Sequence, residues 1–203
     1  MLYPSHYYHL YNHANGSEDL FPEERNYYFF LEKANKYITP FMNVYAYCLM
    51  PNHFHMLVKI KEEEVLFNIC GQSQSFSQMN EMQKIEFVYH KISKSLSNLF
   101  SSYTQSFNKL YQRKGSLFMP NFKTNSIEDD LSFCAITHYI HANPVHHGFV
   151  KDITEWKFSS FTSLCSQATT KLERDYVMEM FGGLRAFREY HSKPIDRKYK
   201  WYD

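Results

Sequence analysis

The sequence has no long hydrophobic run. Nowhere do its 203 residues contain a stretch of about eighteen consecutive apolar residues, the minimum for a membrane-spanning helix. The first residues, Met1 to His6, contain no basic segment leading into an apolar one, so a secretion signal is not expected. These absences predict a cytoplasmic protein that neither crosses a membrane nor is exported.

Cysteine is sparse, and no two cysteines form a Cys-x-x-Cys pair. The four residues are spread along the chain at Cys48, Cys70, Cys134 and Cys165. This spacing excludes the usual zinc-ribbon and thioredoxin-type motifs. We expect free thiols in a reducing compartment.

The sequence also lacks a strong net charge, which is only +1, but its charges are unevenly distributed. Residues 91–125 contain six cations and no Asp or Glu, with aromatic residues interleaved among the cations. The cations are Lys91, Lys94, Lys109, Arg113, Lys114 and Lys123. Such a stretch suits phosphates and unstacked bases. It equally suits an amphipathic helix with core aromatics and solvated lysines, and composition alone leaves both interpretations open.

Hydrophobic residues make up 44% of the chain, enough for a folded core, and their spacing predicts an α+β protein. Residues 62–80 are polar and are expected to form a loop. Together with Lys61 they are interpreted as an insertion, residues 61–80. A helix is expected at residues 127–142, with Ser126 as its cap. It is expected to stop before Asn143-Pro144, because helical geometry is disfavoured for a residue that precedes proline. In chain order, the expected elements are a strand at 7–12, a helix at 22–38, strands at 44–49 and 54–60, one or two helices at 85–111, a strand at 115–123 that Pro120 interrupts or ends, and a helix at 127–142.

Two histidines flank a single apolar residue at the start of a predicted strand. Because side chains two residues apart emerge on the same face, His53 and His55 are expected to point together while Phe54 enters the core. Neutral imidazole is a common metal ligand, so the pair could form half of a metal site.

Tyr139 and Asn143 are four residues apart on a predicted helix and therefore lie on one face. A tyrosine hydroxyl can act as a nucleophile where a neighbouring cation or base favours its phenolate form. The alternative is that Tyr139, one of 17 tyrosines, simply packs in the core.

Thirteen consecutive residues, Ala46 to Val58, resemble the HUH signature of insertion-sequence-200-like transposases, especially the REP-associated tyrosine transposases. Further similar segments follow in the order of that family, and together they span residues 7–161. They are His9-Leu10-Tyr11-Asn12, residues 110–118, Tyr139-Ile140-His141-Ala142-Asn143-Pro144-Val145 and residues 156–161.

The resemblance implies a ferredoxin-like antiparallel sheet with helices packed on it. It also implies that Tyr139 is the nucleophile, and that His53, His55 and Asn143 bind a divalent ion such as Mg²⁺ or Mn²⁺. The implied activity is metal-dependent cleavage and rejoining of single-stranded DNA with hairpin ends, through a 5′-phosphotyrosine intermediate. The six cations of residues 91–125 would then contact DNA. A homodimer is also expected, with a catalytic domain at 1–165 and a helical tail at 166–203.

The sequence departs from this family in places, and two alternatives stay open. His146-His147-Gly148 stands where relatives often have Arg-Ala-Gly, and Asn121 where they often have Arg. One alternative is a protein of the same fold that binds DNA hairpins without cutting them. The other is a small zinc enzyme or zinc-stabilised domain that uses His53, His55 and a third histidine. The candidates for that third ligand are His138, His141, His146 and His147.

Overall fold

The computed structural model describes residues 2–71 and 74–195 and contains a four-stranded antiparallel sheet. The strands lie in the order β2-β3-β1-β4. Their bounds are β1 Tyr7–His13, β2 Met42–Met50, β3 His53–Ile60 and β4 Lys123–Ile127. This order, with one helix between β1 and β2 and a long helix preceded by two short ones between β3 and β4, is the ferredoxin-like arrangement. The predicted α+β fold class is therefore confirmed.

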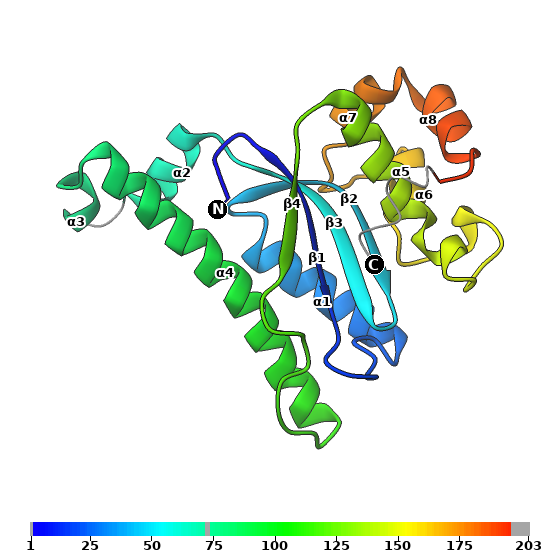
Figure 1. Cartoon of the computed structure of the whole chain (residues 1–203), viewed down its shortest axis with the longest axis horizontal. Helices are drawn as coiled ribbons and strands as arrows, with labels where there is room; N and C mark the ends of the chain where they lie inside the picture. Colours follow the sequence, from blue (N-terminus) through cyan, green and yellow to red (C-terminus); the bar gives the residue numbers. More distant parts are fainter. Residues whose placement is uncertain (1, 72–73, 196–203) are drawn as a thin grey trace.

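Helices cover both faces of the sheet (Figure 1). α1 and α4 pack on one face, and the helices from α5 onward gather on the other. The helices are α1 Glu24–Tyr37, α2 Glu63–Cys70, α3 Gln74–Ser77, α4 Glu81–Leu110, α5 Asp130–His146, α6 Phe161–Cys165, α7 Arg174–Phe181 and α8 Leu184–His191, with a 3₁₀ turn at Ile153–Glu155. None of these helices is both long and apolar enough to cross a membrane.

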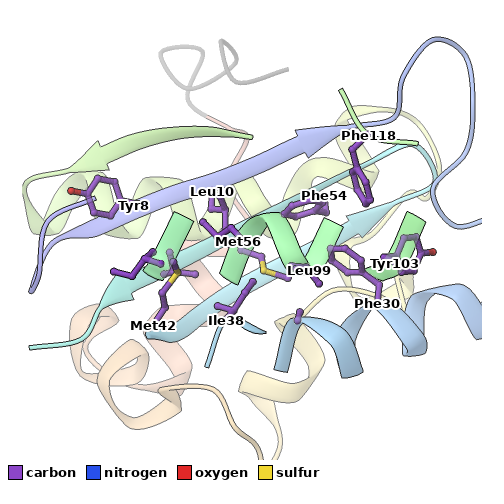
Figure 2. Packing of buried hydrophobic residues seen from close by; sticks show 14 of the residues in the cluster. Tyr8, Leu10, Phe30, Ile38, Met42, Phe54, Met56, Leu99, Tyr103 and Phe118 are labelled. Atoms are coloured by element: carbon purple, nitrogen blue, oxygen red, sulfur yellow. The ribbon is translucent and has the colours of Figure 1, made fainter. Parts of the chain in front are cut away.

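The first core lies between the sheet and helices α1 and α4, as Figure 2 shows. Alternate residues of β3, among them Phe54 and Met56, point into it and meet Phe30 of α1 and Leu99 of α4. Its buried residues on α4 recur every three or four positions from Val88 to Phe107, which makes one side of a single 30-residue helix apolar. This packing holds β3 in place, so the side chains of its opposite face have a fixed position.

The second core lies between the sheet and α5, and it includes residues from α7 and α8. α5 is buried nearly all round: eleven of its residues, from Phe133 to Pro144, are buried. Val177 of α7 and Phe187 of α8 pack into the same cluster as Tyr139. The segment after residue 165 therefore contributes to the core around α5. Residues 196–203 of the predicted tail lie outside the described residues.

The last strand begins later than the sequence predicts. The expected strand at 115–123 is wrong over residues 115–122, which are irregular and form an isolated bridge between Phe118 and Ala14, the residue after β1. Pro120 has no amide hydrogen to give to a ladder, and Asn121 has a left-handed φ of 63°. A strand cannot run through these two residues, so β4 starts at Lys123.

The helix that carries Tyr139 is shifted relative to its prediction at both ends. Asp129, not Ser126, is the N-cap residue, and its carboxylate accepts a hydrogen bond from the Ser132 amide at 2.8 Å. The helix also continues through Pro144 to His146, so the expected end near Ala142 is wrong. Pro144 lies in the last turn and is buried, and burial of its ring offsets the loss of one backbone hydrogen bond.

The polar segment 61–80 is also more regular than predicted, because it contains α2 and α3. Leu66 of α2 and Phe76 of α3 are buried against the first core, which anchors both short helices beside α4. α4 itself begins with a capping box, in which Asn80 and Gln83 each accept a hydrogen bond from the other's backbone amide.

Candidate active site

β3 presents His53 and His55 on the α5 side of the sheet. Phe54 between them enters the first core, as the two-residue period of a strand requires. His53 is 4% exposed and His55 is fully buried. The two rings are 5.1 Å apart and nearly perpendicular. The predicted placement of both imidazoles on one face is confirmed.

α5 brings Tyr139 and Asn143 to the same pair of histidines. The Tyr139 ring meets the His55 ring edge-on with 5.5 Å between centroids, and the Asn143 Oδ1 atom lies 2.9 Å from His53 Nε2. Because α5 runs past Pro144, Asn143 is helical and sits one turn beyond Tyr139. The structure thus gathers four residues that the sequence predicts for the site.

In the neutral form of His53, the form that binds metals, the contact with Asn143 joins two hydrogen-bond acceptors. His53 Nδ1 lies 2.8 Å from the Asn52 side-chain oxygen, which can only accept, so in this form Nδ1 carries the proton and Nε2 has a lone pair. That lone pair faces the Asn143 Oδ1 atom, while the Asn143 amide nitrogen is buried without a partner among the described residues. Rotating the Asn143 amide by half a turn would give an ordinary hydrogen bond. The orientation present directs two lone pairs towards a common point.

His55 is held as a neutral imidazole. Burial, followed by the neighbouring His9 and His53, lowers its pKa well below the usual value, so it does not carry a charge near neutral pH. Its Nδ1 lies 2.9 Å from His9 Nε2, and its Nε2 is buried with no partner among the described residues. A neutral imidazole with one unengaged nitrogen is the form that binds metals.

These donors fit a divalent cation. Octahedral Mg²⁺ has donor distances of about 2.0–2.1 Å, which places neighbouring donors roughly 3 Å apart. His53 Nε2 and Asn143 Oδ1 are separated by 2.9 Å, and the second buried nitrogen belongs to His55. Across residues 2–71 and 74–195, no three His, Cys, Asp or Glu side chains are grouped to hold a metal.

Two of the histidines named in the zinc alternative belong to a separate cluster on α5. His141 Nδ1 lies 2.8 Å from His191 Nε2, and His141 Nε2 lies 2.7 Å from Ser160 Oγ. The ring of His138 is 5.1 Å from that of His191. Burial lowers the pKa of His138 to about 4. This cluster ties α5 to α8 and to the segment beside β2.

Two histidines of β1 that sequence reasoning did not place at the site lie around the pair on β3, together with His147, which it named only as a candidate zinc ligand. His9 and His13 lie on the neighbouring strand β1, and the His13 ring stacks on that of His53 at 4.9 Å. The exposed His147 reaches the His53 ring from the end of α5, at 5.3 Å. The register of β1 and β3, which pairs His13 with His53, creates this crowding. The sequence did contain a signal for this crowding: Tyr7, His9, Tyr11 and His13 occupy every second position and therefore lie on one face of the strand.

The predicted DNA-contacting cations occupy different environments. Lys91, Lys94, Lys109, Lys114 and Lys123 are exposed, as a role in binding phosphates requires. Arg113 is half-buried instead, and its guanidinium donates to Glu18, Asn108 and the Ser116 carbonyl. These bonds hold the loop after α4. The interleaved Tyr103, Phe107 and Phe118 are buried in the first core, as the amphipathic-helix interpretation expects.

Comparisons with known proteins identify the fold. No family model matches the chain. A stretch of 122 residues, which covers 60% of each protein, is 25% identical to a Haemophilus influenzae protein proposed to be a REP-associated tyrosine transposase. The solved structure of a REP-associated tyrosine transposase bound to a REP hairpin is similar with a TM-score of 0.56 and 18% identity, over 82% of this chain and 83% of that one. This chain has the fold of a REP-associated tyrosine transposase.

The resemblance predicted from residues 46–58 and their companions is therefore confirmed. The match spans less than two thirds of the H. influenzae protein, and the solved structure supports the fold. The chemistry of this chain depends on its own side chains between β3 and α5.

Proposed function

We propose that this chain cleaves and rejoins single-stranded DNA at sites flanked by hairpins, with Tyr139 as the nucleophile. The observation that carries the proposal is the convergence of His53, His55, Asn143 and Tyr139 from two separate elements, β3 and α5. A similar fold bound to a REP hairpin supports a hairpin as the DNA partner. The expected homodimer stays a prediction that sedimentation can check.

In the proposed reaction, the Tyr139 hydroxyl oxygen attacks the scissile phosphorus. The bond between phosphorus and the 3′ oxygen breaks, and that oxygen takes up the proton which the phenol gives up. The products are a 5′-phosphotyrosyl protein and a free 3′-OH, and attack by another 3′-OH reverses the step and joins new ends. His53, His55 and Asn143 would hold Mg²⁺ or Mn²⁺, which supplies Lewis-acid polarisation of the phosphate.

The site is closed in this structure. Tyr139, His55 and Asn143 have no exposed surface, so a phosphate cannot reach the phenol until α5 or the side chains around it move. Binding of DNA has to drive that opening, because only a ligand that prefers the open form can shift the equilibrium towards it. The same burial favours the alternative of a protein that binds hairpins without cutting them.

Covalent capture of DNA separates these two functions. The wild-type protein, incubated with Mn²⁺ and labelled single-stranded hairpins from the flanks of its own gene, is expected to give an adduct that survives denaturing electrophoresis. Tyr139→Phe keeps the buried ring and removes only the hydroxyl, so we expect hairpin binding without an adduct. Tyr103→Phe is the matched control, because Tyr103 is a buried tyrosine in the other core.

Equal capture by wild type and Tyr139→Phe would refute the assignment of the nucleophile. Tight binding of the hairpin with no adduct from any variant would establish the non-cutting alternative. His53→Ala should bind the hairpin and lose Mn²⁺-dependent capture, with its melting temperature measured to verify that the fold is kept.

A further inference from the structure

His9 is a buried polar residue that contacts the proposed site without belonging to it. It lies on β1 and has no exposed surface. Its Nε2 atom is 2.9 Å from His55 Nδ1, and the two rings are stacked with 5.0 Å between centroids. The His9 ring also meets the Tyr139 ring edge-on at 5.9 Å. One side chain therefore touches both a proposed ligand and the proposed nucleophile.

The direction of the bond between His9 and His55 decides whether His55 can bind a cation. A neutral imidazole has one nitrogen with a hydrogen and one with a lone pair. If His9 donated, the hydrogen of His55 would lie on Nε2, the buried atom that has no partner among the described residues. If His9 accepts, its own hydrogen lies on its Nδ1 atom, which is buried as well, while His55 carries its hydrogen on Nδ1 and keeps its Nε2 lone pair available to a cation.

We propose that His9 is a positioning residue, which accepts a hydrogen bond from His55 Nδ1 and so keeps the His55 Nε2 lone pair available. This inference rests on the proposed function, because it gives a purpose to that lone pair. Asn52 has the corresponding position for His53, whose Nδ1 lies 2.8 Å from the Asn52 oxygen. Such outer partners fix the tautomer and the ring orientation of metal-binding histidines.

Two substitutions of His9 separate acceptance of this hydrogen bond from simple packing. His9→Leu fills the space without an acceptor, whereas the Gln side chain of His9→Gln has an oxygen that can reach the place of the imidazole Nε2. His191→Leu is the matched control. Like His9, His191 is buried and hydrogen-bonded to another histidine, since its Nε2 lies 2.8 Å from His141 Nδ1. It lies in the separate cluster between α5 and α8.

The first measurement is the tautomer of His55 in the metal-free full chain, obtained from long-range ¹H–¹⁵N NMR correlations. We expect the Nδ1–H form in wild type and in His9→Gln, and a shift towards the Nε2–H form in His9→Leu. The second is the Mn²⁺ dissociation constant, from electron paramagnetic resonance. We expect it to rise by about 10–100-fold in His9→Leu, to stay near wild type in His9→Gln, and not to change in His191→Leu.

An Nε2–H tautomer of His55 in the wild type would overturn the proposal. An unchanged tautomer and an unchanged Mn²⁺ dissociation constant in His9→Leu would also overturn it. If His9→Leu does not fold, the wild-type tautomer and the His9→Gln variant still decide. A wild-type protein that neither binds Mn²⁺ nor forms an adduct, but whose His55 tautomer depends on His9, would refute the nuclease and leave the pairing of His9 with His55 supported.

Discussion

Replacing His191 with glutamine should make the stability of the protein less dependent on pH. His191 Nδ1 lies 2.8 Å from the Phe187 carbonyl, which can only accept, so Nδ1 carries the proton. Its Nε2 atom then accepts from His141 Nδ1, also at 2.8 Å. Protonation of His191 would place two N–H groups against each other. Burial is the main cause that lowers the pKa of His191, to about 3.

The size of the effect follows from this pKa. An unfolded histidine titrates near pH 6.5, so below that pH the unfolded chain binds a proton that the folded protein refuses until about pH 3. The contribution of His191 to stability is therefore complete above pH 6.5 and is lost as the pH falls. Between pH 7 and pH 5 the wild type should lose about 2 kcal/mol through this one residue.

Urea unfolding at pH 7, 6 and 5 measures the difference between wild type and His191→Gln. At pH 7 the variant should be less stable by about 1–3 kcal/mol, because the bond from His141 is disturbed. At pH 5 that deficit should have shrunk by about 2 kcal/mol, since the variant has no histidine to protonate at this position. Titrating groups that do not contact residue 191 cancel, and burial, the main cause that lowers the pKa of His141, is present in both proteins. A deficit that is equal at the two pH values, or larger at pH 5, would show that His191 is not held neutral.

Two further predictions, the first with a control substitution, concern the stability of the fold. Leu99→Ala should reduce the free energy of unfolding, measured with urea, by about 2–5 kcal/mol, because Leu99 is fully buried between α4 and the sheet. Met82→Ala is the control: this side chain is 79% exposed, and its removal should change the free energy of unfolding by less than about 0.5 kcal/mol. Asn80→Ala should cost about 1 kcal/mol, since Asn80 caps α4 through the Gln83 amide, and a thermal melt identical to that of wild type would show that the capping box contributes nothing.

The spacing of residues in the sequence predicted those parts of the site that lie within a single strand or helix. The alternation along β3 placed His53 and His55 on one face, and the helical spacing placed Tyr139 and Asn143 one turn apart. Both follow from backbone geometry that any strand or helix imposes. The meeting of β3 with α5 came from the family resemblance and not from spacing.

Local signals failed where tertiary packing outweighed them. The rule against a helical residue before proline predicted an end near residue 142, but the ring of Pro144 is buried and the helix continues to His146. Residues 61–80 read as a polar loop, yet Leu66 and Phe76 fold against the core and give two short helices. In each case, burial of apolar surface compensates for a poor local preference.

The contact between His9 and His55 could not be read from the sequence, because it depends on the register between strands that are far apart in the chain. The structure pairs Tyr11 with His55 and His9 with Leu57, which makes His9 a diagonal neighbour of His55. A shift of one residue would turn His9 to the opposite face.

The histidine cluster on α5 also bears on how the closed site can open. His141 lies between Tyr139 and Asn143 in the chain and bonds to His191 of α8 and to Ser160, whose hydroxyl accepts from the Tyr47 amide of β2. Moving α5 away from β3 alone would break these buried bonds, at about 1–3 kcal/mol for each group left unsatisfied. Moving α5 together with α8 keeps the bond between His141 and His191 and strains only the one at Ser160. For the proposed reaction, the less costly opening is therefore one in which α5 and α8 move as a unit, and a bound hairpin would have to offset the contacts that this unit makes with the sheet and with α7.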